Sequence, residues 1–244
     1  MDGHINELGQ PIGFPVPDWQ PSEHPRGARM QGRLCRLEPV DIEAHASDLY
    51  RSFGEDREQR NWTYLPYGPF AGEDAFRDWL GKTCLGDDPC FFSVIDAAEG
   101  HAVGLASYLR IEPAVGVIEV GHIHFSPRMQ GKPISTEAMY LMMRRVFETG
   151  GYRRYEWKCD SLNRPSRSAA QRLGFAFEGI FRQATIYKQR NRDTAWYSIL
   201  DSEWPAAKAA FEKWLDDDNF AADGGQKTSL SETMREALAP LRRS

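Results

Sequence analysis

The segment spanning residues 115–177 constrains the fold of this chain more than any other part. The pattern of Val117–Phe125 predicts a strand, that of Ile134–Thr149 a helix, and that of Tyr152–Cys159 a second strand. A short helix follows from about Asn163. A strand, a helix, a strand and a helix in this order form a crossover unit within a sheet. We therefore expect an α+β fold with a central mixed, twisted β-sheet flanked by helices.

We expect a single domain with an extension at each end. Residues 1–32 contain repeated prolines, which exclude a regular helix or a central strand, so this segment is expected to be an extended N-terminal arm. The domain itself is expected over 33–215. An acidic linker and a short amphipathic helix, Ser229–Leu241, are expected over 216–244. The apolar side chains expected to anchor the arm to the domain are Ile12, Phe14, Val16 and Trp19.

Strand and helix patterns also alternate in the rest of the domain. A hairpin is expected near its end, formed by Ile180–Lys188 and Thr194–Leu200 with a turn at Asn191–Asp193. The other expected elements are the strands Leu34–Leu37, Cys90–Asp96 and Ala102–Arg110 and the helices Asp41–Phe53, Gly72–Thr83 and Trp204–Leu215.

Composition narrows the classes of protein to consider. Apolar residues make up 41% of the 244 residues, enough for a sizeable core, and the net charge of −5 argues against a nucleic-acid-binding protein. The four cysteines form no C-x-x-C pair, so neither a metal site nor a disulfide framework is expected. The N-terminus lacks the pattern of a signal peptide, and no apolar run reaches membrane-spanning length. We expect a soluble cytoplasmic protein.

The turn between the first strand and helix of the crossover unit has the chemistry of an anion site. Gly131 allows close backbone approach just before the N-terminus of the helix, where free N–H groups favour anions. Arg128 and Lys132 add positive charge there. Pro133 suits the first helical position but has no N–H to donate. The alternative is an ordinary strand-to-helix turn.

A second motif follows the second strand of the unit. Asn163 is a good helix N-cap, Pro165 fits the first turn, and Gly174 suits the position just after the helix. Ordinary helix capping therefore explains these three residues. It does not explain Ser166 equally well.

Together, the Arg128-x-x-Gly131-x-Pro133 turn and the pattern Asn163-x-x-Ser166 with Leu173-Gly174-Phe175 resemble the GNAT superfamily of N-acetyltransferases, in its RimJ/RimL-like subgroup. The resemblance implies the GNAT fold and transfer of an acetyl group from acetyl-CoA to a primary amine, on a protein N-terminus or a small molecule. Pro133 departs from the family pattern, which has Gly or Ala there.

The resemblance also implies roles for individual residues. Asn163 would contact the pantetheine arm of CoA, and Ser166 would lie near the CoA sulfur and protonate it. The residues expected to bind the co-substrate are Phe125, Ser126, Arg128, Gly131, Lys132, Pro133, Ile134, Ser135, Asn163 and Ser166.

Three residues are candidates for the base that deprotonates the amine. Glu119 lies within an apolar strand, where a carboxylate is costly unless it is used or paired; its alternative role is an ion pair with a nearby arginine. His122 and His124 alternate with Glu119, so they are expected on the other face of the strand unless a bulge near Gly121 changes the phase. We expect Glu119 and Ser166 to be catalytic, with Tyr187 as the alternative acid.

Other features leave their roles open. The aromatic loop Trp62–Phe70 and the helix segment Phe76–Leu80 are candidates for the wall of the acceptor pocket or for ordinary core. The alternative function is a non-catalytic acyl-CoA-binding or interaction module on the same fold. The extensions could form a homodimer that buries Ser229–Leu241. The expected partners are acetyl-CoA and an amine acceptor, without metal, nucleic acid or membrane.

Overall fold

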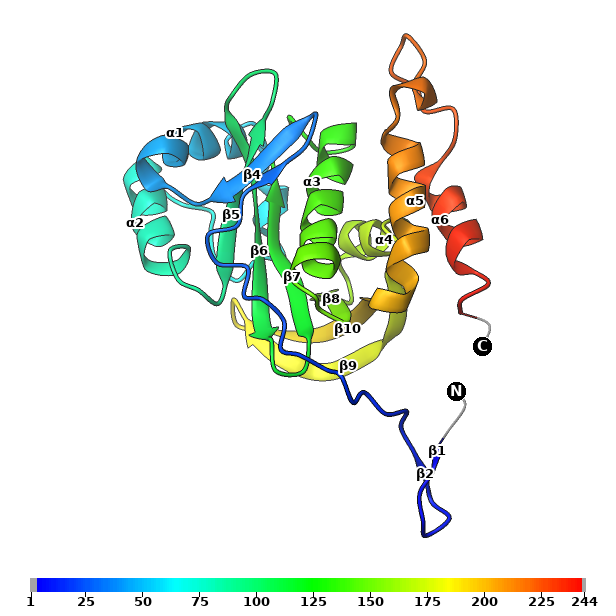
Figure 1. The fold of residues 1–244 in the computed structure, drawn as a ribbon. Helices are drawn as coiled ribbons and strands as arrows, with labels where there is room; N and C mark the ends of the chain where they lie inside the picture. Colours follow the sequence, from blue (N-terminus) through cyan, green and yellow to red (C-terminus); the bar gives the residue numbers. More distant parts are fainter. Residues whose placement is uncertain (1–3, 243–244) are drawn as a thin grey trace.

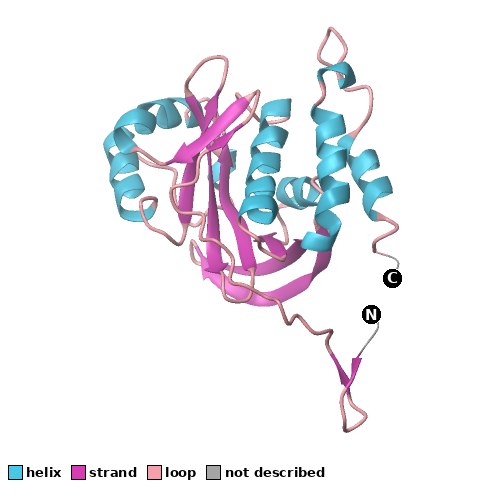
Figure 2. Ribbon diagram, viewed as in Figure 1, coloured by secondary structure: helices cyan, strands magenta, loops and turns pink. Residues whose placement is uncertain are grey.

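A computed structural model describes residues 4–242 of the chain. Ten strands and six α-helices follow one another along it (Figures 1 and 2). The strands are β1 (His4–Ile5), β2 (Pro11–Ile12), β3 (Met30–Gln31), β4 (Cys35–Pro39), β5 (Cys90–Asp96), β6 (Ala102–Glu112), β7 (Val117–Phe125), β8 (Arg154–Asp160), β9 (Ala176–Tyr187) and β10 (Arg190–Leu200). The α-helices are α1 (Ile42–Phe53), α2 (Glu73–Thr83), α3 (Pro133–Arg144), α4 (Arg164–Arg172), α5 (Trp204–Leu215) and α6 (Leu230–Leu238).

Eight strands form one mixed sheet in the order β3-β4-β5-β6-β7-β8-β10-β9. The β7–β8 pair is parallel, because α3 connects these strands as a crossover, and all other pairs in the sheet are antiparallel. The last strand, β10, is inserted between β8 and β9. The predicted α+β fold with a mixed sheet is confirmed.

The two faces of the sheet are covered by different helices (Figure 1). On one face α1 and α2 pack over β5 and β6, in a core that includes Phe53, Phe76 and Leu105. On the other face lie α3, α4, α5 and α6, in a core that includes Tyr155 and Phe211. These two faces are called the α1/α2 face and the α3/α5 face below.

The turn of the terminal hairpin differs from the prediction. The two strands meet at Lys188 and Gln189, whose φ angles of 45° and 61° belong to a tight hairpin turn. Asn191 and Asp193 lie within β10 instead. The Asp193 carboxylate accepts hydrogen bonds from the Asn191 side chain and from the backbone N–H of Gln183 in β9. These turn-forming residues therefore stabilise an irregularity in the ladder rather than the turn.

The N-terminal arm is attached to the domain by Trp19 rather than by the apolar residues before it. The Trp19 indole donates a 2.8 Å hydrogen bond to the carbonyl oxygen of Ala114 and packs over Gly116. The prediction that Ile12 and Val16 are anchors is wrong, because their side chains are exposed. The Phe14 side chain is also exposed, but the Arg153 guanidinium lies over its ring, 5.8 Å from the centroid. The first residues of the arm instead pair as a small hairpin of β1 and β2.

The C-terminal helix α6 belongs to the core of the same chain. Leu230, Met234 and Leu238 are buried, and the helix packs against α4 and α5. Ser229 caps it by accepting a hydrogen bond from the N–H of Glu232. The apolar face of this helix is therefore covered within the chain, and a dimer cannot bury it as we expected.

A buried carboxylate joins the beginning of the domain to α3. The Glu137 side chain accepts hydrogen bonds from the backbone N–H groups of Arg33, Leu34 and Cys35 at 3.0, 2.7 and 2.8 Å. A Cβ atom at Gly32 would lie 2.5 Å from its carboxylate, so only glycine fits beside it. These charge-assisted bonds determine where β4 begins.

We predict that Glu137→Gln lowers the free energy of unfolding by about 2–3 kcal/mol, because an amide cannot accept all three backbone donors and leaves a buried N–H group unpaired. Urea denaturation followed by circular dichroism measures this. Glu236→Gln on the exposed surface of α6 is the control and should change stability little. An equal, small effect of both substitutions would contradict the role given to Glu137.

Candidate functional site

The strands β7 and β8 part in the middle of the sheet. They pair in parallel from Val117 with Arg154 to Val120 with Trp157, and the pairing ends there. β7 continues to Phe125 and β8 to Asp160. The facing backbone edges beyond Val120 and Trp157 are therefore left without strand partners among the described residues. Such an opening offers N–H and C=O groups to an extended ligand inserted between the strands.

A β-bulge in β7 lies beside this opening. Leu105 pairs with His124 and Ser107 with Gly121, so two residues of β7, His122 and Ile123, lie opposite one residue of β6. His122 has a φ of 51°. We expected His122 and His124 to face away from Glu119 unless a bulge near Gly121 changed the phase of the strand, and this bulge is present. All three side chains lie on the α1/α2 face.

The two histidines occupy different surroundings. The Nδ1 atom of His122 lies 3.1 Å from the Tyr67 hydroxyl, and burial lowers the pKa of its imidazole to about 4. His124 stacks on Phe53 with ring centroids 3.9 Å apart, and neither of its ring nitrogens has a partner in the described chain. Burial lowers the pKa of His124 to about 3. Both side chains are held neutral at pH 7, and His124 is a packed core residue.

The turn after β7 presents backbone donors at the start of α3. Gly131 adopts a φ of 69° and has open space where a side chain would lie. Among residues 4–242, no acceptor meets the N–H groups of Gly131 and Ile134. Arg128, at the other end of the turn, is paired with Glu55 at 2.6 Å and Glu99 at 3.2 Å.

The neighbouring residues of the same turn complete this arrangement. Ser126 is fully buried, and its hydroxyl group has no partner within the described part of the chain. The Phe125 carbonyl accepts a hydrogen bond from the Gln130 side chain, and the Ser135 hydroxyl donates to the Lys132 carbonyl. Pro133 occupies the first position of α3 and is followed by buried Ile134. The Lys132 side chain is exposed beside the free N–H groups.

The second motif places a hydroxyl group beside the end of β8. Asn163 caps α4 by accepting the N–H of Ser166 at 3.2 Å, which leaves its side-chain amide donor without an acceptor in the range 4–242. The Ser166 oxygen accepts a 3.0 Å hydrogen bond from the Trp157 indole N–H. Because this bond uses an oxygen lone pair, the Ser166 O–H remains able to donate.

Glu119 lies in a chain of ion pairs on the α1/α2 face, in which the side chains of Glu119, Lys158 and Glu156 are buried. One of its oxygens, Oε2, lies 2.6 Å from Arg110 and 2.9 Å from Lys158. Lys158 also lies 2.7 Å from Glu156, and Arg154 joins Glu156 to Glu178. The other oxygen of Glu119, Oε1, has no hydrogen-bond partner among the described residues.

This environment has opposing effects on Glu119. The side chain is only 4% exposed, and burial raises the pKa of its carboxyl group while Lys158 and Arg110 oppose that rise. The ion pair with an arginine, one of the two roles considered for Glu119, is therefore present. A carboxylate with one oxygen held and the other free is also positioned to accept a proton at the free oxygen.

Sequence reasoning missed the residues that hold Glu119 and Ser166. Lys158, Glu156 and Trp157 all lie on β8, where polar and aromatic residues alternate between the two faces of the sheet. The signal was present: charged residues two positions apart in an otherwise apolar strand must share a face and need partners there. Which partners they find depends on the pairing of β7 with β8.

Tyr187, the alternative acid, donates a 2.9 Å hydrogen bond to Asp160 at the end of β8. Burial and this carboxylate raise the pKa of the Tyr187 phenol to about 12. The aromatic loop after α1 lies nearby. Its Tyr64 hydroxyl bonds to the Leu162 carbonyl, while Trp62 packs in the core with Phe53. The loop thus contributes both to the core and to the surroundings of the opening.

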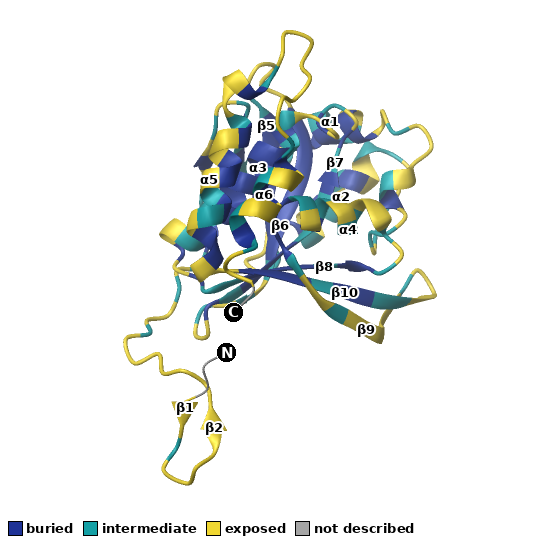
Figure 3. Ribbon diagram, turned by 90° about the vertical axis from the view of Figure 1, so that its right-hand side faces the viewer, coloured by how far each residue is buried: buried dark blue, intermediate teal, exposed yellow. Residues whose placement is uncertain are grey.

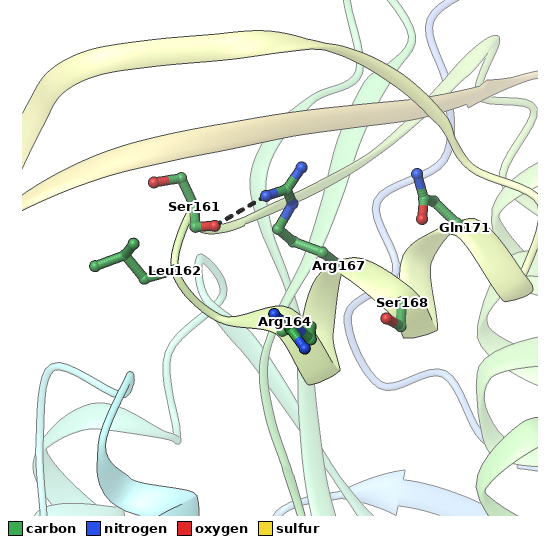
Figure 4. A pocket seen from close by; sticks show the side chains of 6 residues that line it. All are labelled: Ser161, Leu162, Arg164, Arg167, Ser168 and Gln171. Carbon is green, nitrogen blue, oxygen red and sulfur yellow. Dashed lines mark hydrogen bonds between the residues drawn. The ribbon is translucent and has the colours of Figure 1, made fainter.

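A separate hollow of about 340 Å³ lies along the outer flank of α4. Figure 4 shows Arg167 reaching from this flank to the Ser161 carbonyl, at 3.1 Å. Arg167 also bonds to the Tyr197 hydroxyl at 3.1 Å. The bond to Ser161 stabilises the turn before Asn163, and the bond to Tyr197 connects α4 to β10, so Arg167 supports the second motif structurally. The hollow is lined by Ser161, Leu162, Arg164, Arg167, Ser168 and Gln171.

Comparison with known proteins assigns the family. A family model for the acetyltransferase (GNAT) domain matches residues 35–176. The chain belongs to the GNAT acetyltransferase family. A crystal structure of a GCN5-related N-acetyltransferase from Brucella melitensis is 46% identical, with a TM-score of 0.88, over 90% of this chain and 99% of that one.

Two further relatives of this GNAT chain are more distant. The ribosomal-protein-serine acetyltransferase of Escherichia coli (strain K12) is 31% identical over 106 residues, which cover 43% of this chain and 59% of that protein. The microcin C7 self-immunity acetyltransferase MccE, solved in complex with acetyl-CoA and AMP, is 19% identical. Its TM-score is 0.61 over 69% of this chain and 93% of that chain, which shows a shared fold.

The GNAT family uses acetyl-CoA, and the residues of this chain fit such a ligand. The opening between β7 and β8 suits the extended pantetheine arm, and the free N–H groups of Gly131 and Ile134 suit a pyrophosphate. The buried Ser126 hydroxyl, without a partner in residues 4–242, lies where the opening meets the turn. Within that range no group of His, Cys, Asp and Glu side chains could hold a metal ion, and no helix is long and apolar enough to cross a membrane.

We predict that His124→Phe reduces the loss of stability of this protein in acid. The folded state holds His124 neutral with a pKa of about 3, while the unfolded chain protonates it near pH 6.5, so its contribution is lost as pH falls from 6.5 towards 3. The variant should gain about 1.4 kcal/mol per pH unit relative to the wild type below pH 6.5. Urea denaturation at pH 7, 6 and 5 measures this, with His4→Phe in the exposed arm as the control. Parallel pH dependences of wild type and His124→Phe would show that His124 is not buried neutral.

Proposed function

We propose that this protein is an acetyl-CoA-dependent N-acetyltransferase that transfers an acetyl group to a primary amine. The single observation that carries the proposal is the opening between β7 and β8, with backbone donors of the Gly131 turn at one side and the Ser166 hydroxyl at the other. The acceptor is a protein N-terminus or a small-molecule amine. The name of the E. coli relative supports a protein acceptor.

Different residues around the opening bind different parts of the co-substrate. The turn from Phe125 to Ser135 binds the pyrophosphate through the N–H groups of Gly131 and Ile134 and the charge of Lys132. Pro133 contributes no donor but starts α3 at the right position. The free amide donor of Asn163 binds a carbonyl of the pantetheine arm. The bound co-substrate supplies the acetyl group as a thioester next to the bulge in β7.

Glu119 acts as the base that deprotonates the amine, and Ser166 acts as the acid that protonates the leaving sulfur. The free Oε1 of Glu119 accepts a proton from the amine, directly or through water, while Arg110 and Lys158 hold Oε2 in place. Burial supports this role, because a raised pKa makes the carboxylate a stronger base. Ser166, oriented by the Trp157 indole, donates its O–H to the leaving sulfur. Tyr187 is engaged with Asp160, which favours Ser166 as the acid.

Arg128 and Glu119 each form ion pairs with other residues, and these pairs favour a second candidate function. The Arg128 guanidinium, which is paired with two carboxylates, is less available to bind a phosphate. Glu119, paired with two cations, can have a purely structural role. The protein would then be a non-catalytic acyl-CoA-binding module. Calorimetry that detects acetyl-CoA binding, together with no acetyl transfer across a panel of N-terminal peptides and small amines, would support this function. Absence of acetyl-CoA binding would exclude both.

We predict that Ser166→Ala lowers kcat about 100-fold and leaves the affinity for CoA within twofold, because the loss removes the proton donor but no binding contact. Steady-state kinetics with a free-thiol assay and CoA calorimetry measure the two effects. Ser168→Ala on the outer flank of the same helix is the matched control. Full activity of Ser166→Ala would contradict the role of Ser166, while an equal loss in Ser168→Ala would indicate damage to α4.

We predict that Lys158→Met moves the acidic limb of the pH profile of kcat/KM to higher pH by about one unit. Removing a cation beside Glu119 destabilises its carboxylate and raises its pKa further, so a higher pH is needed to form the base. The charged groups in this surrounding are Arg110 of β6, Lys158 of β8 and Glu156, which shares Lys158.

Two further variants make this measurement decisive. Arg110→Met removes the more exposed cation and should shift the limb in the same direction by a smaller amount. Exposed Lys82→Met should leave the profile unchanged. Circular dichroism reports whether Lys158→Met is folded. An unshifted limb in folded Lys158→Met and in Arg110→Met would exclude Glu119 as the base.

A further inference from the structure

Exposed apolar side chains gather in two places on this molecule. Five of them lie in the N-terminal arm and four on β9, whereas the remaining ones among the described residues are scattered singly. Single exposed apolar residues are normal on a protein surface, but contiguous ones indicate an interaction site. The exposed residues of the two groups are Ile5, Leu8, Ile12, Phe14 and Val16 in the arm and Phe177, Ile180, Phe181 and Ile186 on β9.

The arm forms an ordered structure away from its own domain. Its strands pair with His4 opposite Ile12, and the Asn6 side chain closes the turn by accepting the N–H groups of Leu8 and Gln10. Figure 1 shows this hairpin projecting from the body, which the chain joins at Trp19. An isolated two-stranded hairpin is marginally stable at best in water. Its apolar side chains therefore need a partner surface.

The edge of the sheet presents partly exposed apolar side chains on both of its faces: Phe177 packs on Tyr197 beside α4, and Phe181 stacks on Trp196 on the α1/α2 face. β9 is the outermost strand, and Figure 3 shows it largely exposed. Register shifts in its pairing with β10, near Gly179 and Gln183, break the regular edge. Because bulges discourage the addition of another strand, a partner would contact the side chains of β9 rather than extend the sheet.

The charges of the two segments are complementary. Residues 4–18 of the arm carry Glu7 and Asp18 and no Lys or Arg. The hairpin of β9 and β10 is basic, since residues 176–200 contain two acids, Glu178 and Asp193, and four cations. These cations are Arg182, Lys188, Arg190 and Arg192. Opposite charges around apolar patches favour association and select its partner.

Geometry points to a second copy of the chain as the partner. Figure 3 shows the arm hairpin and the tip of the β9–β10 hairpin on opposite sides of the molecule, so the arm does not cover β9 of its own chain. Two copies related by a twofold axis can each place an arm on the other's hairpin. We propose that this protein forms a homodimer in which the arm of each subunit, residues 4–18, docks on the β9–β10 hairpin of the other.

This dimer is tested on the full-length protein by light scattering coupled to size-exclusion chromatography, with sedimentation to measure the dissociation constant. The expected mass is twice the 27.8 kDa of the chain at micromolar concentration. Leu8→Glu combined with Phe14→Glu should give a monomer whose circular dichroism spectrum matches that of the wild type, because both side chains are exposed and outside the core. Leu85→Glu, at an isolated exposed position, is the control and should remain a dimer.

A charge exchange tests the orientation of the contact. Arg182→Glu with Arg190→Glu should weaken the dimer at least tenfold, and adding Glu7→Lys with Asp18→Lys should restore it. A monomeric wild-type protein would overturn the proposal. A dimer that survives Leu8→Glu with Phe14→Glu, or charge-reversed variants that are not rescued, would also overturn it. The result is independent of acetyl transfer, which is assayed separately.

Discussion

The candidate site depends on the place where two parallel strands stop pairing. A sheet normally satisfies every interior backbone group, and leaving an edge open within the sheet is costly unless a ligand completes it. In this chain the pairing of β7 with β8 ends at Val120 and Trp157. The bulge at His122 lies just beyond that point on one strand, and Ser166 is held beside the other by Trp157. The separation thus brings the turn at Gly131 and the capped helix at Asn163 together as parts of one candidate site.

The sequence predicts the parts of this site that are made by local structure. Helix capping at Asn163, the glycine turn at Gly131 and the order of strands and helices follow from residue preferences over a few positions. The α+β fold could therefore be predicted, and the resemblance to the GNAT family implied the co-substrate. The turn of the terminal hairpin could not, because Asp193 bonds to Gln183 across the ladder and the turn moves to Lys188 and Gln189. Such a contact forms only after the strands are paired.

The charges around Glu119 could not be predicted for the same reason. Whether Glu119 meets Arg110, Lys158 or a histidine depends on register, and a bulge of one residue reverses the direction of every side chain beyond it. The contacts of the N-terminal arm could not be predicted from the sequence either. Its apolar residues suggest attachment to the domain, but an apolar side chain needs only some partner surface, and the sequence does not say in which molecule that surface lies.

The insertion of β10 between β8 and β9 has a consequence for how the chain folds. In the sheet, β9 pairs with β10 only, and the outer edge of β8 is completed by the same strand. During synthesis, β8 and β9 therefore emerge before the strand that joins them, and the half of the sheet beyond β8 assembles only after residue 200. The helices α5 and α6, which cover the α3/α5 face, follow later still. Closure of the domain is thus a late, non-local event, which favours slow folding and a need for protection of the β8 edge until the chain is complete.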